Sequence, residues 1–179
     1  SGHITAVGFE LYCQLLKQSV SRLKGEKVEK RVEVVILLDF LELNPHSAKE
    51  SNNNKLTTAS GDRMESACLP YKYIEDVRHR VDVYRKLAQT SKMSELKELR
   101  DELQDRFGKM PRPVDLLFLI AEIKILSASR LITRIECEKA KVKITRNNEL
   151  VSLGGRFPRL TKKTPQARLK EIKFLIQSF

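Results

Sequence analysis

The most distinctive spacing of charged residues occurs close to position 105. Glu102, Asp105 and Arg106 stand at i, i+3 and i+4, so on a helix they share one face and can offer carboxylates and a guanidinium to a partner. They lie just before Gly108, which is typical of a helix end, where the helix dipole disfavours carboxylates. This pattern predicts either a docking surface or a set of local ion pairs that contribute little stability.

A second charged pattern fills the C-terminal part of the chain. Residues 130–173 hold thirteen Lys or Arg and four Glu, which accounts for most of the net charge of +11. Such a patch can attract a phosphate backbone or an acidic protein, or it can be a solvated face. Only Phe157 could stack on bases within it, which disfavours single-strand binding. The nucleic-acid hypothesis names the contacts Arg134, Lys139, Lys141, Lys143, Arg146, Arg159, Lys162 and Lys163.

The patterns that accompany catalysis are missing from the sequence. Neither G-x-x-x-x-G-K nor G-x-G-x-x-G occurs, and the three histidines lack metal-ligand spacing. We therefore predict that this chain is not an enzyme and holds no metal or cofactor. The three cysteines are odd in number and far apart, which favours reduced thiols in the cytoplasm. No apolar run is long enough to span a bilayer.

The first third of the chain predicts a helix, a strand and a loop. Apolar residues keep a helical stripe over 9–23. The run "RVEVVILLDFLEL" at 31–43 is β-branched and apolar, which favours a strand buried for much of its length. The stretch 46–66 is rich in Ser, Asn and Thr and is expected to be a flexible surface insert.

The sequence of the middle of the chain predicts a group of packed helices. Residues 69–74 contain a proline and should be extended, and Asp76 can cap a helix. A second helix should run to Phe107, and a third should open at Pro113 and continue through Leu131. The residues expected to share the buried face of the first of these helices are Val77, Val81, Tyr84, Leu87 and Ala88.

The C-terminal part predicts strands followed by a helix. Asn147 and Asn148 suit a hairpin turn, Gly154 and Gly155 suit a second turn, and 166–179 carries a helical stripe. The element order indicates an α+β fold, with a helical array packed on a small, mostly antiparallel sheet. The inward positions of the strands should be Ile135, Cys137, Val142 and Ile144.

Three segments, in this order, carry a family pattern. They read "SGHITAVGFELYCQLL" from residue 1, "LPYKYIEDVRHRVDVYRKLA" from residue 69 and "ELKELRDELQDRFGKMPRPVDLL" from residue 95. The chain resembles the C-terminal (TRCF) domain of the bacterial transcription-repair coupling factor (Mfd) family over 1–25 and 69–131. The insert at 46–66 and the basic region after 131 depart from that pattern.

The resemblance implies a domain organisation and a role. Residues 1–25 would be the helical tail of an upstream motor, and 26–179 would be a single regulatory domain, monomeric in isolation. The parent would be an ATP-dependent double-stranded DNA translocase that displaces stalled RNA polymerase in nucleotide excision repair, with ATP and Mg²⁺ bound outside this fragment. The domain would dock on the UvrB-like module of the same chain and mask its UvrA-binding surface. Glu102, Asp105 and Arg106 match the family's docking motif.

Overall fold

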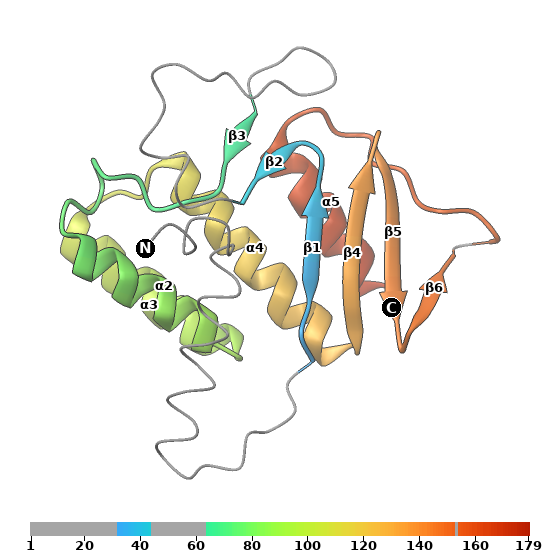
Figure 1. Cartoon of the computed structure of the whole chain (residues 1–179), viewed down its shortest axis with the longest axis horizontal. Coiled ribbons are helices and arrows are strands. Elements are labelled where there is room, and N and C mark those ends of the chain that lie inside the picture. Colours follow the sequence, from blue (N-terminus) through green and yellow to red (C-terminus); the bar gives the residue numbers. More distant parts are fainter. Residues whose placement is uncertain (1–31, 44–63, 153) are drawn as a thin grey trace, which may run out of the picture.

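The computed structural model describes residues 32–43, 64–152 and 154–179. The helix expected over 9–23 and most of the insert, 46–63, lie outside these residues. Figure 1 shows a small sheet beside a group of helices. The strands are β1 (Val35–Leu38), β2 (Leu41–Glu42), β3 (Glu65–Ser66), β4 (Ile132–Glu138), β5 (Lys141–Arg146) and β6 (Glu149–Val151). The helices are α2 (Val77–Gln89), α3 (Met93–Phe107), α4 (Arg112–Ser129) and α5 (Pro165–Gln177).

The main sheet has the strand order β1-β4-β5-β6. β1 runs parallel to β4, whereas β4 with β5 and β5 with β6 are antiparallel. The expected α+β fold with a mostly antiparallel sheet is therefore confirmed. A second, two-stranded sheet pairs β2 with β3 in parallel.

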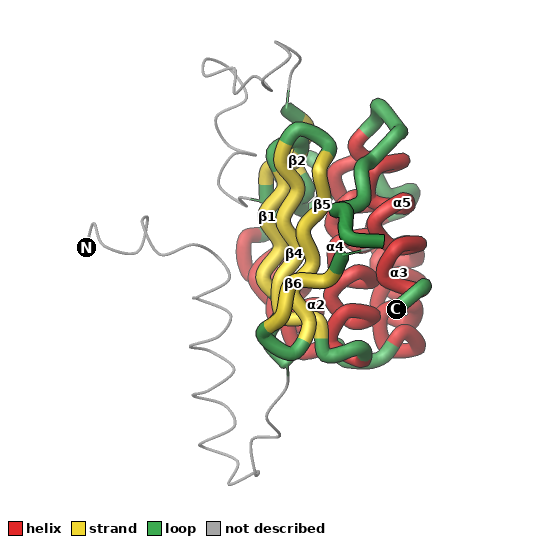
Figure 2. The backbone as a smooth tube through the Cα atoms, turned by 90° about the vertical axis from the view of Figure 1, so that its right-hand side faces the viewer, coloured by secondary structure: helices red, strands yellow, loops and turns green. Residues whose placement is uncertain are grey.

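Helices α4 and α5 cover one face of the sheet. Figure 2 shows the strands in one layer, with α3, α4 and α5 to one side of it and α2 nearer the plane of the strands. The central helix α4 packs against β4, α3 and α5. None of the described helices is long and apolar enough to cross a membrane.

Two hydrophobic clusters meet at α4. The sheet cluster joins the inner side chains of β1, β4 and β5 to α4 and α5, and it includes Ile135, Cys137, Val142 and Ile144 as expected. The helical cluster joins α2, α3 and the first half of α4 around Leu103 and Phe118. Leu117 packs against both clusters, so α4 connects them.

Local signals set most of the element ends. The Asp76 side chain accepts a hydrogen bond of 2.7 Å from the backbone N–H of Arg78 and caps α2. Gly108 ends α3 with a φ of +78°, a conformation that glycine adopts without strain. Asn147 and Asn148 also have positive φ, as a tight hairpin turn between β5 and β6 requires.

The predicted thirteen-residue strand is wrong in length and in burial. Instead, β1 and β2 are short strands separated by a turn at residues 39–40. Burial alternates along β1, and Val35 and Leu37 are 37% and 47% exposed. The reason is that, among the described residues, helices cover only one face of the sheet.

Three further predictions for the first half need correction. The sequence predicts an insert that reaches residue 66, but Glu65–Ser66 form β3, which pairs with β2. Residues 69–74 form a turn in which the N–H groups of Tyr73 and Ile74 donate to the Pro70 carbonyl. The buried residues of α2 are Val83 and Tyr84, whereas Val77 and Val81 are exposed.

Candidate functional site

The end of α3 carries the three charged residues whose spacing predicts a docking surface. Leu96, Leu99 and Leu103 bury one face of this helix in the helical cluster. This packing turns Glu102, Asp105 and Arg106 away from the core, with Asp105 exposed and Glu102 half-buried. The prediction that the three charges share an outward face is consistent with the ion pair that joins Glu102 to Arg106.

Glu102 is held by two cations of its own chain. Both of its carboxylate oxygens accept hydrogen bonds of 2.9 Å from the Lys86 ammonium group, which comes from the last turn of α2. Arg106 donates a further bond of 2.9 Å from the next turn of α3. The hydrogen bond from Lys86 lowers the pKa of the Glu102 carboxyl, and that from Arg106 acts in the same direction. Part of this surface therefore also joins α2 to α3.

Asp105 differs from Glu102. Its carboxylate is exposed, and within the described ranges its side chain makes no hydrogen bond or ion pair. It also lies next to the negative end of the helix dipole, which disfavours a carboxylate. Asp105 therefore has no evident stabilising role in the described part of the fold. Asp105 is the member of the three that is free to meet a charge outside this chain.

Aromatic residues support the neighbouring Arg106. The guanidinium carbon of Arg106 lies 5.1 Å from the centroid of the Phe107 ring. That ring packs in tilted geometry against Tyr73, at 5.9 Å between centroids, and against His79 of α2, at 6.4 Å. The Tyr73 hydroxyl donates at 3.2 Å to the carbonyls of Leu103 and Gly108. These contacts fix the direction in which the helix end points.

Sequence reasoning missed the residues that pair with this surface. Lys86, Tyr73 and His79 lie far from Glu102 in the chain, and no spacing rule relates positions on different helices. The only local signal was the basic residue in the last turn of α2, which suits the helix dipole whether or not a partner is present.

The eight cations of the nucleic-acid hypothesis fall into separate places. Arg134 pairs in register with Thr145 and is bound to Glu136 at 2.9 Å, and Arg146 lies at the same end of the hairpin opposite Ile132. Lys143 lies in mid-strand on β5. The remaining five gather at the other end of the sheet, around the β4–β5 turn: Lys139, Lys141, Arg159, Lys162 and Lys163. The structure thus brings five of the eight together.

Two hollows lie near these surfaces. One, of about 260 Å³, lies between α2 and α3 and includes Lys86 and Glu102 in its lining. The other, of about 300 Å³, lies at the β4–β5 end and is lined by Asp39, Glu138 and Lys141 among others. In the ranges that the structure describes, no three His, Cys, Asp or Glu residues are grouped as a metal site would need.

The sequence and the fold are similar to those of known proteins. Residues 64–152 match the family model of the TRCF domain. The transcription-repair-coupling factor of Bacillus subtilis (strain 168) is 30% identical over 151 residues, covering 83% of this chain and 10% of the relative. That of Buchnera aphidicola subsp. Acyrthosiphon pisum is 33% identical over 127 residues, covering 71% of this chain and 13% of the relative. The chain thus spans about a tenth of the length of these relatives.

A solved structure gives a similar fold. It is described as the crystal structure of the C-terminal domain of transcription-repair coupling factor, with a TM-score of 0.50 and 19% identity. The match covers 84% of this chain and 98% of that one. The class is therefore an α+β domain with helices on one face of a small mixed sheet. The chain belongs to the TRCF domain family, the C-terminal domain of transcription-repair coupling factors.

Proposed function

We propose that this chain is a non-catalytic regulatory domain that docks the end of α3 on the UvrB-like module of its parent chain and so masks UvrA binding. The parent would be an ATP-dependent duplex-DNA translocase that displaces stalled RNA polymerase in the cytoplasm. ATP and Mg²⁺ would bind in its motor, outside this chain. The family match over 64–152, which contains all of α3, supports the proposal.

The unpartnered carboxylate of Asp105 carries the proposal. A charge that opposes the helix dipole and makes no described side-chain contact is best explained by a cation on a partner. Arg106, braced by Phe107, offers a planar donor beside it. In a docked state both charges would lose water, so their pairing would be geometrically specific.

The internal pairing of Glu102 changes which residue should be tested. Replacing Glu102 would disturb both the α2–α3 contact and the docking surface, because Lys86 would lose its partner on α3 and keep only Asp82 of its own helix. Asp105 has no such partner within the described residues, so Asp105→Ala separates docking from folding.

The test uses the full-length parent and its UvrA binding in the absence of polymerase. Asp105→Ala should raise the apparent UvrA affinity at least tenfold, because losing one partner of a desolvated charge pair costs roughly 2–5 kcal/mol of docking energy. Glu149→Ala is the matched control, since Glu149 is exposed on β6 and carries the same charge. Equal UvrA affinity in the wild type and the Asp105 variant, with both folded, would contradict docking through this face.

A further inference from the structure

The five cations at the β4–β5 end are brought together by backbone contacts. We call Lys139, Lys141, Arg159, Lys162 and Lys163 the basic end. Arg159 forms an antiparallel bridge with Lys141, and the Leu160 N–H donates to the Ala140 carbonyl at 2.8 Å. These contacts attach the segment after β6 to the start of β5. The cations of that segment and of the β4–β5 turn therefore lie at the same end of the sheet.

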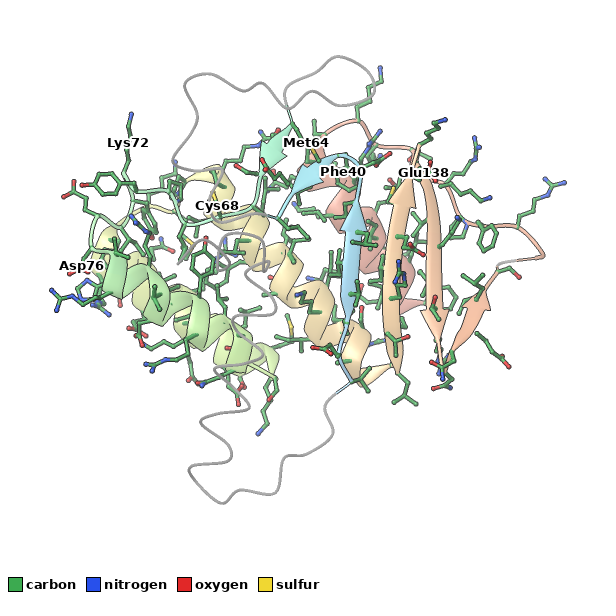
Figure 3. All side chains as sticks on the ribbon, in the orientation of Figure 1. Phe40, Met64, Cys68, Lys72, Asp76 and Glu138 are labelled. Atoms are coloured by element: carbon green, nitrogen blue, oxygen red, sulfur yellow. The ribbon has the colours of Figure 1, made fainter. Side chains whose placement is uncertain are left out.

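The loop that carries Lys162 and Lys163 is fixed at the same place. The Arg168 guanidinium donates to the Lys162 carbonyl at 2.9 Å and lies 5.1 Å over the Phe40 ring. Figure 3 labels Phe40 and Glu138 at the same upper end of the sheet. The N-terminus of α5 begins just after these lysines and has no acidic residue in its first turn, so its dipole adds to the positive field.

The charges of the basic end are only partly balanced by nearby carboxylates. None of its five cations forms an ion pair with any residue that the structure describes. The carboxylates close to it are largely engaged with backbone groups: Asp39 accepts from the Lys139 N–H, and Glu171 accepts from the Thr161 and Lys162 N–H groups. Asp39 and Glu138 are both exposed near the turn and keep their negative charges, so the five cations exceed the nearby described carboxylates without being unopposed.

The chemistry of the basic end favours a nucleic acid over a protein. Protein interfaces have an apolar centre, whereas nucleic-acid interfaces are polar and positively charged. No large apolar side chain is exposed in the two described segments that build this end, 138–143 and 156–168. The Phe157 ring lies 4.6 Å from the Lys141 ammonium group, so that cation already occupies one face of the ring on which a base would stack.

From these observations we infer that the basic end binds the phosphate backbone of double-stranded nucleic acid without sequence preference. The site lies across the fold from the end of α3, beyond β1 and α4 (Figure 1). Backbone binding and docking through Asp105 therefore use separate surfaces, and each can be removed while the other stays intact.

The test is binding of the 179-residue chain to a fluorescently labelled 20-base-pair duplex, followed by anisotropy between 50 and 200 mM KCl. Affinity should fall with salt with a log–log slope near −0.9 for each phosphate contact. The triple variant Lys139→Glu, Lys162→Glu and Lys163→Glu should lose at least tenfold in affinity at 50 mM KCl, and its slope should be shallower by about three contacts.

A charge-matched control separates a site from bulk charge. Lys72→Glu, Lys97→Glu and Lys109→Glu change the net charge equally at exposed positions near α2 and α3. This variant should keep most of the affinity and the full salt slope. Thermal unfolding of both variants checks that they are folded, and Asp105→Ala should bind duplex like the wild type, which keeps this test independent of docking.

Three results would overturn the inference. The first is no duplex binding by the wild type at 50 mM KCl. The second is an equal loss in the two triple variants, which would mean that net charge alone attracts the duplex. The third is tighter binding of poly-glutamate than of the duplex at equal charge concentration, which would assign the basic end to an acidic protein partner instead.

Discussion

The two charged regions of this domain differ in how their charges are balanced. At the end of α3, Glu102 is matched within the chain by Lys86 and Arg106, and Asp105 stands beside this network. At the basic end, like charges gather without described carboxylate partners. A balanced network fixes the geometry of a few side chains and suits one specific partner, whereas an unbalanced patch produces a field that attracts any polyanion. Substitution of Glu102 should therefore affect folding, whereas substitutions at the basic end should not.

The largest effect should come from removing the packing under the α3 surface. Leu103 is fully buried in the helical cluster, and Leu103→Ala should lower the free energy of unfolding by about 2–5 kcal/mol. Leu150, at 58% exposure on β6, is the control, and its substitution should change stability by no more than about 0.5 kcal/mol. Urea unfolding measures both variants. A small loss at Leu103 would mean that the α3 surface does not depend on this cluster.

A smaller effect is expected from Glu102, and it should depend on pH. Glu102→Gln should cost up to about 1 kcal/mol at pH 7, a modest value because the Lys86 pair is partly exposed and screened by solvent. The pKa of the Glu102 carboxyl is lower in the folded chain than in the unfolded one. Its contribution is therefore fully present above the unfolded pKa and is lost as the pH falls through the folded pKa.

The pH dependence gives the decisive comparison for Glu102. Unfolding of the wild type and of Glu102→Gln should differ at pH 7 and converge in the acidic range below the ordinary pKa of glutamate. A difference that stays constant down to acidic pH would show that packing, and not the ion pair with Lys86, accounts for the cost.

The smallest effect on stability should come from the basic end. Lys162→Ala combined with Lys163→Ala should leave the free energy of unfolding unchanged within about 0.5 kcal/mol, or raise it slightly by relieving repulsion. Chemical denaturation at low salt is the measurement, since screening is weakest there. A clear loss of stability would reveal that these lysines pair within the fold, and the contrast between the two regions would disappear.

Local rules predicted the parts of the fold that depend on neighbouring residues. The cap at Asp76, the helix end at Gly108 and the turn at Asn147 each follow from the conformational preferences of one or two residues. Alternation along β4 and β5 also predicted their inward residues, because a strand with one buried face leaves that pattern in the sequence.

The errors came from contacts between distant segments. Whether Val35 and Leu37 are buried depends on how many faces of the sheet are covered by helices. The apolar character of these two residues does not distinguish a covered face from an open one. Likewise, the sequence placed Glu102 and Asp105 on one face as equivalent charges, but Lys86 from another helix distinguishes them. The sequence could predict a charged surface at the α3 end, but it could not show which carboxylate is free.

The parallel pairing of β1 with β4 has a consequence for the order of folding. Val35 pairs with Arg134, so this pairing closes a loop of about a hundred residues. Closing the loop costs conformational entropy, which opposes the pairing until other contacts of the sheet have formed. Helices α2, α3 and α4 lie within that loop, and the contacts that join them to one another span fewer residues, so these contacts form faster. During synthesis, β1 leaves the ribosome long before its partner strand exists. The helical cluster should therefore form first, and the exposed edge of β1 should wait for β4 to complete the sheet.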